Sequence, residues 1–445
     1  MNLIEKIVKK EFKIAVWGFG YIGLSTAMNF ADKGIKCVGI DLNPNLVNMI
    51  NNGIVPFTGL KEWFTLPFED FVEDGLITAS SNLNDINFDQ IDVHIVCVNT
   101  DSDDNPYKDN LVTVLNTIAD KINFSEQERL IVIESTISPN WIDEDIVPIF
   151  EKINNKSLHS IGFSPRRDWF LDRDKSQSNI PRVIGMSSDI SNPLGYELYS
   201  ICNDNVILAF DWKHAAMVKV VENTIRYLGI NFANQLSVAF PELNVSEILK
   251  LCSTKWNIPE YHPSLGIGGY CIPLAPKYVL EGAKHNSHLK ILDDGIKWEN
   301  EYLEHLSLVI KNLRIRKIGI LGLSYAPNLK IHKLSPAISI SKSLLKQGLD
   351  CKLYDPYYTQ EEINNILNVG TFDINNELDQ FDLLIVVAAH KEFYNLKSLL
   401  DKCVNKPIII DNLGDLKETF VDSNYPYFEM GNIKGLSSIT FKQLV

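Results

Sequence analysis

The feature that most constrains the fold lies near the amino terminus, where residues 13–41 follow the order strand, glycine turn, helix, strand, acid. Residues 13–17 read KIAVW, a short apolar strand, and run directly into GFGYIG at residues 18–23. Helical spacing of apolar residues follows from Leu24 to Lys33, and a second apolar run at 37–40 ends in Asp41. A GxGxxG motif in this setting predicts a dinucleotide-binding unit in a doubly wound α/β domain.

The glycines of this motif have separate physical roles. Gly18 suits the tight turn, Gly20 lets a pyrophosphate approach the backbone, and Gly23 lets the helix pack closely on the strand. The start of the helix, at Tyr21 and Ile22, adds N–H groups and a partial positive charge that favour a pyrophosphate. We therefore predict that these five residues contact a dinucleotide cofactor.

Asp41 indicates which dinucleotide is bound. Its carboxylate, at the end of the second strand, can accept hydrogen bonds from a ribose diol and would repel a 2′-phosphate. NAD is therefore expected rather than NADP. FAD proteins and some nucleotide-sugar enzymes share this unit, so the motif alone does not name the reaction.

Length and composition limit the remaining possibilities. A chain of 445 residues is too long for one ordinary core and predicts two or three domains. A formal net charge of −14 argues against a nucleic-acid partner. Without a recognisable secretory signal or membrane-spanning run, we expect a cytoplasmic protein with no membrane partner. Seven scattered cysteines without metal-ligand spacing predict reduced thiols, mostly in the core, and no metal site.

Further strands alternate with helices along the chain. Apolar runs at 93–98, 130–133 and 181–185 are expected to extend a parallel sheet to about residue 205. A second strand that enters a glycine turn begins at Lys317, and a helix from about Pro336 to Gln347 follows it. Additional apolar runs lie at 351–355, 383–387 and 407–411. The last third is therefore predicted to be a second doubly wound unit, without a complete GxGxxG.

Residues 212–251 carry a long helical periodicity instead of a strand pattern. Apolar residues at three- and four-residue steps mark a face that we expect to be buried: Val218, Val221, Ile225, Leu228 and Phe232. Lys219, Asn223 and Arg226 form another stripe, so their side chains meet on one surface. Such a stripe is usually only a solvated face, although asparagine in mid-helix between two cations is unusual.

Residues 266–273 read GIGGYCIP, a glycine run followed by Cys271 and a proline. The missing side chains of Gly266, Gly268 and Gly269 would let a ligand lie against the backbone, where Cys271 can meet it. A thiolate in such a loop is a candidate covalent nucleophile. The alternative is a structural cysteine in a tight turn.

Taken in order, these motifs resemble those of the nucleotide-sugar 6-dehydrogenases, the UDP-glucose and UDP-N-acetyl-mannosamine dehydrogenase family. The resemblance covers nearly the whole chain, and it depends on the order and spacing of several segments. They are GFGYIGL at 18–24, VNT at 98–100, EST at 134–136, VKVVENTIR at 218–226, HPSLGIGGYCIP at 262–273, LGLSY at 321–325, SPA at 335–337 and YDP at 354–356.

The resemblance implies two doubly wound Rossmann-like domains joined by a central helical segment, usually in a homodimer. The expected NAD domain covers residues 1–207, the central segment 208–305 and the nucleotide-sugar domain 306–445. The implied activity is oxidation of the C6 primary alcohol of a nucleotide sugar, a UDP-sugar, to the carboxylate with two NAD reduced. Capsule or surface-polysaccharide synthesis is the expected context.

The resemblance also implies roles for single residues. Cys271 would add to the C6 aldehyde as a thiohemiacetal, which a second hydride transfer converts to a thioester that water releases as the acid. Lys219 would stabilise the oxyanion, Asn223 would hold that oxygen or a water, and Thr136 would position the catalytic water. Thr100 and Glu134 are expected near the cofactor. Substrate contacts are expected from Arg226, Tyr261, Gly266, Gly268, Gly269, Tyr325 and Lys333.

Two catalytic positions depart from the family pattern. Ala275 stands where the family has an aspartate four residues after the cysteine, and Arg166 stands where it has a glutamate that assists thioester hydrolysis. Part of the proton-transfer set is therefore missing. Asp168 or Asp172 is a candidate to replace the lost glutamate.

The last domain departs as well. Ala326 and Lys333 replace a lysine and an arginine, and Lys330 stands where the family often has an acid. A lysine can hold a phosphate but cannot reproduce the arginine fork, so we expect altered phosphate geometry.

These departures leave two alternatives to the full oxidation. One is a divergent enzyme that stops at the aldehyde or carries out another NAD-dependent reaction on a nucleotide sugar. The other is a catalytically silent nucleotide-sugar binding protein. The retention of Cys271, Lys219 and Asn223 argues against silence, since a binding protein has no chemical need of them.

Overall fold

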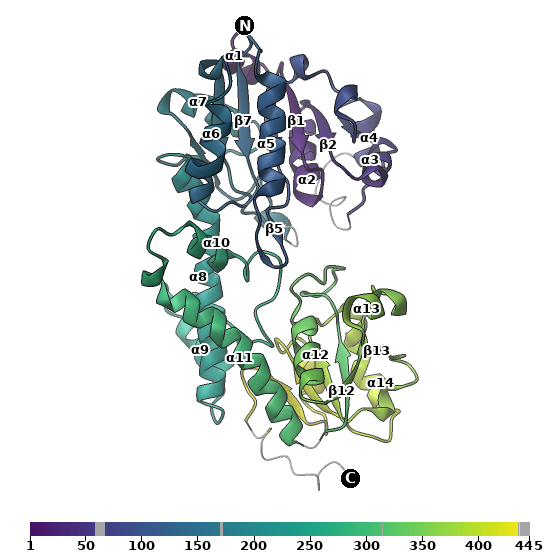
Figure 1. The fold of residues 1–445 in the computed structure, drawn as a ribbon. Helices are drawn as coiled ribbons and strands as arrows, with labels where there is room; N and C mark the ends of the chain where they lie inside the picture. The colour runs from purple at the N-terminus through teal and green to yellow at the C-terminus, as the bar shows by residue number, and fades with distance from the viewer. Residues whose placement is uncertain (58–66, 170–171, 314, 435, 437–445) are drawn as a thin grey trace. The chain divides into compact units, whose positions relative to one another are not determined.

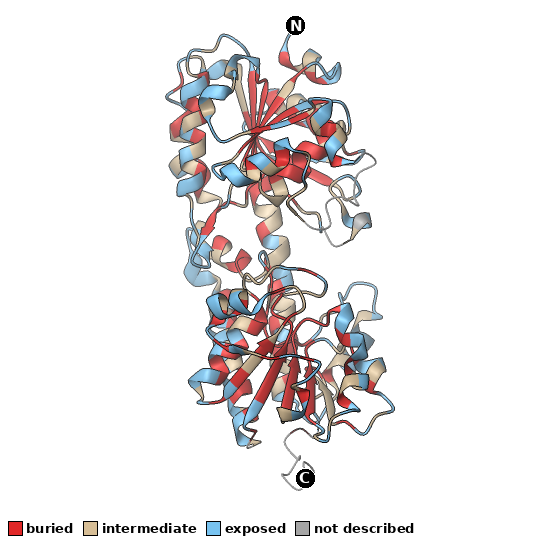
Figure 2. Cartoon of the chain, turned by 90° about the vertical axis from the view of Figure 1, so that its right-hand side faces the viewer, coloured by how far each residue is buried: buried red, intermediate tan, exposed pale blue. Residues whose placement is uncertain are grey.

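A computed structural model describes residues 1–57, 67–169, 172–313, 315–434 and 436. The chain divides into two compact units, one of residues 1–222 with 277–284 and the other of residues 223–276 with 285–445 (Figure 1). Each unit is built around one sheet whose strands are largely buried (Figure 2). In the described ranges, no helix combines the length and the apolar composition needed to cross a membrane.

The first unit contains an eight-stranded sheet in the order β10-β9-β8-β7-β4-β1-β2-β3. Its strands are β1 (Lys13–Trp17), β2 (Lys36–Ile40), β3 (Ile77–Ser80), β4 (Val93–Val96), β7 (Arg129–Ile133), β8 (His159–Phe163), β9 (Arg182–Met186) and β10 (Val206–Leu208). A short ribbon of β5 (Asp101–Ser102) and β6 (Asn105–Pro106) follows β4. Strand β1 pairs in parallel with β2 and β4, so the winding reverses between β1 and β4. In such sheets ligands bind at the carboxyl ends of the strands beside this reversal.

Helices cover both faces of this sheet. One face packs in a single hydrophobic core against α1 (Leu3–Val8), α2 (Tyr21–Ala31), α3 (Pro44–Asn51), α4 (Phe68–Glu73) and α7 (Asn192–Ser200). The other face is covered by α5 (Asp109–Ile122) and α6 (Val147–Phe150) (Figure 1). Residues of β1 and β4 alternate between the two faces, with Ile14, Val16, Val93 and Ile95 in the core beneath α2. The doubly wound arrangement expected from the glycine motif is confirmed.

Strand β9 corrects the expectation of a parallel sheet through residue 205. It pairs antiparallel to β8, with Gly162 opposite Met186, and β10 then pairs parallel to β9. An antiparallel neighbour needs no crossover helix. In the described part of this connection, the regular structure is one short 3₁₀ turn at Arg173–Lys175. The connection can therefore fold back against α2, with consequences described below.

The second unit contains a six-stranded parallel sheet in the order β13-β12-β11-β14-β15-β16. Its strands are β11 (Lys317–Leu321), β12 (Asp350–Tyr354), β13 (Gly370–Thr371), β14 (Leu383–Val386), β15 (Ile408–Asp411) and β16 (Tyr427–Glu429). Its helices include α9 (Val245–Ser253), α11 (Lys290–Asn312), α12 (Pro336–Lys346), α13 (Gln360–Leu367), α14 (Leu396–Leu400) and α15 (Lys417–Phe420). The second doubly wound unit is thus confirmed. Helices α8 (Trp212–Ala239) and α10 (Ala275–Gly282) each begin in one unit and end in the other.

Helix α8 does not bury the apolar face that its periodicity predicts. Val221, Ile225 and Phe232 are 37%, 56% and 59% exposed. From Thr224 to the end of α8, the buried positions are Thr224, Tyr227, Asn231, Ala233, Asn234 and Ser237. Two of these amides bond to backbone inside the unit, because Asn231 donates to the Gly295 carbonyl at 3.0 Å and the side-chain oxygen of Asn234 accepts the Ser264 N–H at 2.7 Å. Hydrogen bonds to neighbouring backbone, which apolar periodicity does not encode, select the buried face.

Candidate active site

The glycine turn after β1 has the geometry that a pyrophosphate needs. Gly18 has a φ of +83°, in the region that favours glycine. A Cβ at Gly23 would lie 1.9 Å from the Gly18 carbonyl oxygen, so only glycine allows α2 to approach β1 this closely. A Cβ at Gly20 would meet no atom within 4 Å, and among the described residues no side chain caps α2 there. The helix end that begins with Tyr21 and Ile22 therefore keeps the open, uncapped form that suits an anion.

Asp41 has the position expected for a ribose contact. The second unit has an aspartate at the equivalent position of its own glycine turn, with which Asp41 can be compared. Asp41 is half-buried, and its Oδ2 accepts the Phe19 N–H at 2.8 Å. In the second unit, Asp355 follows β12 and accepts the Leu323 N–H at 2.7 Å. Asp355, however, is 1% exposed and lies 3.0 Å from His390 Nε2. Both turns share one design, but only the Asp41 turn leaves its acid accessible to a ligand.

Two predicted site threonines lie together at the carboxyl edge of the first sheet. Thr100, beyond β4, donates its hydroxyl hydrogen to the carbonyl oxygen of Thr136, beyond β7. Tyr278 of α10 donates to the Thr100 carbonyl, and its hydroxyl lies 3.1 Å from Thr100 Oγ1. Thr100 is buried and Thr136 is half-buried. Tyr278, which no sequence motif indicates, thus anchors this edge of the predicted cofactor site.

Glu134, another predicted cofactor residue, lies inside a buried ionic network. Its carboxylate accepts hydrogen bonds from Thr26 of α2 at 2.7 Å, from Tyr199 of α7 at 2.8 Å and from Arg182 of β9. Burial alone would raise the pKa of Glu134, but Arg182 and Arg166 outweigh burial and hold the pKa below its ordinary value. Because the carboxylate is 1% exposed, its visible role is to fix α2 beneath the glycine turn.

Arg166, the first catalytic departure, belongs to the same network. Its guanidinium binds both oxygens of Asp168, at 2.8 and 2.7 Å. Its Nη1 also donates to the Ile22 carbonyl at 3.1 Å and to the Thr26 hydroxyl at 2.6 Å. Arg166 is 3% exposed. The residue that replaces the family glutamate is therefore a buried support for the cofactor helix.

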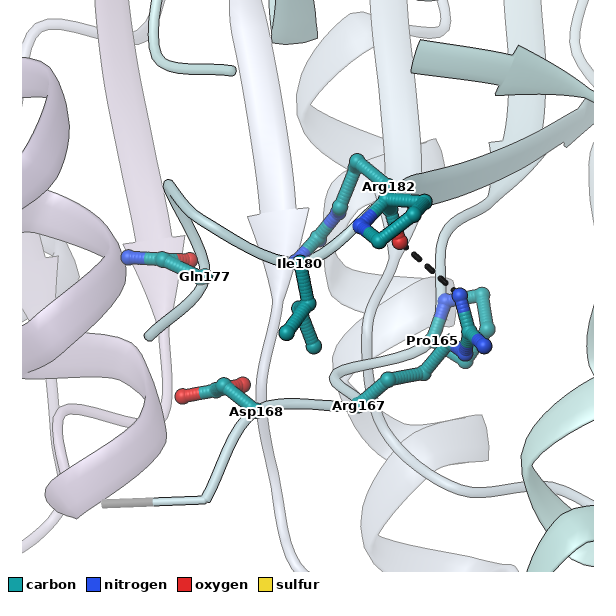
Figure 3. A pocket seen from close by; sticks show the side chains of 7 residues that line it. Pro165, Arg167, Asp168, Gln177, Ile180 and Arg182 are labelled. Atoms are coloured by element: carbon teal, nitrogen blue, oxygen red, sulfur yellow. Dashed lines mark hydrogen bonds between the residues drawn. The ribbon is translucent and has the colours of Figure 1, made fainter. Parts of the chain in front are cut away.

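Neither proposed replacement for that glutamate is free to act as a base. Burial would raise the pKa of Asp168, but the pair with Arg166 holds it below its ordinary value. Figure 3 shows Asp168 at a small hollow, a space too small for a water molecule, that is also lined by Pro165, Arg167, Gln177, Ile180, Pro181 and Arg182. Asp172 forms a surface ion pair with Lys175 at 2.9 Å. Among the described residues of this connection, neither Asp168 nor Asp172 therefore has the free carboxylate that would replace the glutamate.

The residue after Arg166 links the same connection to α8. Arg167 binds both oxygens of Glu222. It also donates to the Pro181 carbonyl at 2.8 Å, the bond that a dashed line marks in Figure 3. Glu222 lies on α8 between Lys219 and Asn223, the two residues predicted to hold the C6 oxygen. The Arg167–Glu222 pair, which the sequence analysis missed, thus connects this segment to α8 beside its predicted catalytic stripe. An arginine in a connection and a glutamate on a helix carry no local signal of pairing.

The predicted stripe on α8 retains its spacing. Lys219 and Asn223 are half-buried, and Arg226 is exposed. Separations of four and three residues place the three side chains along one side of the helix. Tyr261, also predicted to contact substrate, packs its ring over Gly229 of α8, where a Cβ would lie 2.2 Å from the ring.

The glycine run before Cys271 packs against the last domain within the second unit. A Cβ at Gly268 would lie 2.6 Å from Pro336 Cδ, and a Cβ at Gly269 would lie 3.2 Å from the Tyr325 ring. Gly269 also has a φ of +95°. The glycines are thus required for packing, in addition to any room they leave for a ligand. Cys271 itself is exposed, which excludes the alternative of a buried structural thiol.

Tyr325 and Lys333 lie beside this loop. Burial and the nearby Cys271 raise the pKa of Tyr325 to about 12. Lys333 Nζ lies 4.8 Å from the centre of the Tyr270 ring, next to Cys271 in the chain. The structure therefore brings Cys271 together with two of the predicted substrate residues. All seven cysteines are free, and Cys252 is the other exposed one, so the thiols are less often in the core than expected.

The glycine turn with its accessible acid and the exposed thiol loop define a dinucleotide-dependent oxidoreductase with two doubly wound domains. Family models agree with this class over most of the chain. They describe the UDP-glucose/GDP-mannose dehydrogenase family, with its NAD binding domain at residues 12–203, its central domain at 213–301 and its UDP binding domain at 319–417. The chain belongs to this family and is an NAD-dependent nucleotide-sugar dehydrogenase.

Individual relatives are similar over nearly their full length. A UDP-N-acetyl-D-mannosamine dehydrogenase of Methanococcus aeolicus is 30% identical over 88% of this chain and 88% of its own. A UDP-N-acetyl-D-glucosamine 6-dehydrogenase of Pseudomonas aeruginosa is 28% identical over 87% of this chain and 92% of its own. The solved structure of UDP-D-ManNAc dehydrogenase from Pyrococcus horikoshii has a TM-score of 0.80 at 23% identity, covering 95% of this chain and all of that one.

Proposed function

We propose that the protein oxidises the C6 primary alcohol of a UDP-N-acetylhexosamine to the uronic acid through a covalent intermediate on Cys271. The observation that carries the proposal is the exposed thiol on a glycine loop that packs against Tyr325 and Pro336 of the UDP binding domain. The names of the two relatives, which act on N-acetylated UDP-hexosamines, support the sugar class.

The residues present fit NAD. The backbone at Gly18, Gly20, Tyr21, Ile22 and Gly23 would hold its pyrophosphate. The carboxylate of Asp41 would accept hydrogen bonds from the ribose diol, and Thr100 and Glu134 would support the site from beneath. When bound, NAD accepts the hydride in each of the two oxidations.

The chain's own groups would carry the remaining steps. Lys219 would stabilise the alkoxide at C6 that forms when the alcohol gives its proton to water, before the hydride leaves, and again the oxyanion that forms when a thiolate adds to the aldehyde. The Cys271 thiolate would add to the resulting aldehyde, forming a C–S bond, and loss of a second hydride would give the thioester. Water would then displace the thiolate to give the carboxylate. The role proposed for Asn223 is to hold the C6 oxygen or a water, and the role proposed for Thr136 is to position the catalytic water.

We propose that two parts of the second unit bind the substrate, one beside the glycine loop and one at α8. Tyr325 and Lys333 would contact the nucleotide sugar beside the loop of Gly266, Gly268 and Gly269. Arg226 and Tyr261 would contact it from the side of α8. Lys333 would attract the diphosphate as a point charge.

We also propose a homodimer that uses the apolar side chains exposed on α8 and α9. They include Ile225, Phe232, Ile248 and Leu251. Large apolar side chains that are exposed close together commonly mark an interface. The cytoplasm remains the predicted compartment.

The test is an assay with NAD and a panel of UDP-GlcNAc, UDP-ManNAc, UDP-glucose and GDP-mannose, with NADH followed by absorbance and products identified by mass. Two NADH and one uronic acid per UDP-N-acetylhexosamine are expected. One NADH with an aldehyde would instead establish the enzyme that stops halfway. Binding without turnover would establish the silent protein.

Thiol variants complete the test. C271S is expected to form no uronic acid, because serine at neutral pH cannot replace the thiolate. The matched control is C252S, which alters the other exposed cysteine and is expected to keep the normal rate. Acid formation at the normal rate by C271S would refute the covalent mechanism.

A further inference from the structure

The loop that carries Cys271 is tied down by side chains from several parts of the second unit. We call residues 264–271 the thiol loop. The Ser264 N–H donates to Asn234 of α8 at 2.7 Å, and the Leu265 N–H donates to Asn412, after β15, at 2.7 Å. Tyr302 of α11 donates to the Ser264 carbonyl at 2.8 Å. Neutral side chains therefore fix the beginning of the loop.

Among the side-chain ties, the one nearest to Cys271 is of a different kind, and further along the loop the Gly269 N–H donates to the Leu334 carbonyl at 3.3 Å. The Ile267 N–H donates to Glu299 Oε1, from α11, at 2.7 Å. Gly266, directly before it, has a φ of +129°, and a Cβ there would lie 3.2 Å from the same oxygen. A side chain at position 266 would thus strain the backbone and crowd the carboxylate. Glu299 and Gly266 together define the turn from which the loop continues to Cys271.

The surroundings of Glu299 are poor in partners. Its Oε2 is buried without a hydrogen-bond partner among the described residues, and none of the salt bridges found there includes it. The titratable groups that face it are Tyr227 from α8 and Tyr302 from its own helix. The Asn231 amide also lies nearby on α8. Burial, opposed by the Ile267 N–H and Asn231, raises the pKa of Glu299 to about 7.

We propose that Glu299 is a positioning residue for the thiol loop, whose ionised carboxylate holds the Ile267 N–H and so orders the segment that presents Cys271. A charged acceptor forms a shorter and stronger hydrogen bond than a neutral one, so protonation loosens this tie. The other side chains that hold the beginning of the loop do not ionise near neutral pH. The order of the loop before Cys271, and with it the exposure of the thiol to a ligand, therefore depends on whether Glu299 is ionised.

The first experiment compares E299Q with E301Q. Glutamine keeps the acceptor oxygen but cannot ionise, and Glu301 is an exposed residue of the same helix. For E299Q, kcat at pH 8 is expected to fall about fivefold, the ratio for exchanging a charged for a neutral hydrogen bond, with the KM for NAD unchanged. The inflection of kcat near pH 7 is expected to disappear in E299Q and to persist in E301Q. An unchanged inflection in active E299Q would overturn the proposal.

The second experiment does not depend on dehydrogenase activity. In a C252S background, the rate of alkylation of Cys271 by iodoacetamide is measured from pH 5.5 to 9. The wild-type loop is expected to show an inflection near pH 7 in addition to the titration of the thiol, and E299Q only the latter. E299D keeps the charge, but its side chain is one methylene shorter and is expected not to reach the Ile267 N–H. The inflection near pH 7 is therefore expected to be absent in E299D as well. If the C252S protein that keeps Glu299 shows only the titration of the thiol, without the inflection near pH 7, the control of the loop by Glu299 is refuted.

The catalytic meaning of this inference rests on the proposed role of Cys271, and the two experiments separate the failures. If C271S remains active while alkylation follows Glu299, the covalent mechanism fails and the control of the loop stands. If C271S is inactive while the rate of alkylation does not depend on Glu299, the covalent mechanism stands and the control of the loop by Glu299 fails.

Discussion

Arg166 binds Asp168 with two hydrogen bonds, of 2.8 and 2.7 Å, inside the first unit. The pair is nearly inaccessible, with side chains 2% and 3% exposed. An arginine thus stands where the family has a glutamate. The same arginine pairs with Asp168, one of the two carboxylates that were candidates to replace this glutamate. Arg166 therefore adds a positive charge to the network that supports α2, and the predicted hydrolysis of the thioester lacks the glutamate that assists it in the family.

The first prediction concerns the order of the rates. With Ala275 and Arg166 in place of two carboxylates, hydrolysis of the Cys271 thioester is expected to be slower than both hydride transfers, since general acid–base catalysis contributes about a hundred- to ten-thousandfold. Stopped-flow absorbance should show a burst of two NADH per active site, and mass spectrometry of quenched enzyme should show the acylated thiol. A linear time course without acylated protein would contradict this order.

The second prediction concerns Arg166 as a structural residue. Arg166→Met would leave Asp168 and Glu134 buried with one cation fewer, and breaking a buried pair costs about 3–5 kcal/mol. Urea unfolding of the first unit is expected to show a loss of this size. The control is Lys175→Met, which removes the surface partner of Asp172 and is expected to leave the free energy of unfolding nearly unchanged.

The third prediction concerns cofactor choice. Asp41→Ala is expected to raise the KM for NAD about tenfold, because hydrogen bonds to a charged group are lost, and to narrow the preference for NAD over NADP. Initial rates with both cofactors at saturating sugar measure the change. Asp74→Ala, an exposed acid at the end of α4, is the matched control and should leave both constants as they are.

The fourth prediction concerns acid stability. Burial, together with Arg129 and His159, lowers the pKa of His94 to about 3. A histidine with a lowered pKa in the folded state contributes stability above its unfolded value of about 6.5, and this is lost as the pH falls. His94→Asn, which can still accept the Trp17 indole hydrogen, is expected to flatten the fall in unfolding free energy between pH 6.5 and 5, by up to about 1.4 kcal/mol per pH unit. His305→Asn, an exposed site, should not alter it.

The fifth prediction concerns assembly. Phe232→Glu is expected to halve the mass in light scattering, from twice the 50.4 kDa of one chain to a single chain, because a charge would be buried in the proposed interface. Phe124 is 80% exposed and belongs to the first unit, outside the sequence of α8 and α9. Phe124→Glu should leave the mass unchanged. A wild-type protein of single-chain mass would refute the homodimer.

Local features were predictable because their physical causes are local. The turn at Gly18, the start of α2 and the acid after β2 follow from neighbours in the chain, and the structure reproduces them. The second doubly wound unit was equally readable, since strands such as β11 and β14 are continuous apolar runs. The exposure of Cys271 also agrees with the glycine run in front of it.

Other features depend on residues distant in sequence, and no local pattern encodes them. The antiparallel turn into β9 brings Arg166 under α2, some 140 positions away, and thereby removes Asp168 as a base. The buried face of α8 is chosen by amides that bond to Gly295 and Ser264, against the apolar stripe.

The sequence by itself therefore determined the two nucleotide-binding folds, the NAD turn and the candidate thiol, because backbone conformation and strand patterning are set by adjacent residues. Only the tertiary structure decided which charges are free to act. The ionisation of a carboxylate such as Asp168 or Glu299 depends on burial and on partners supplied by other elements, and packing alone brings these together.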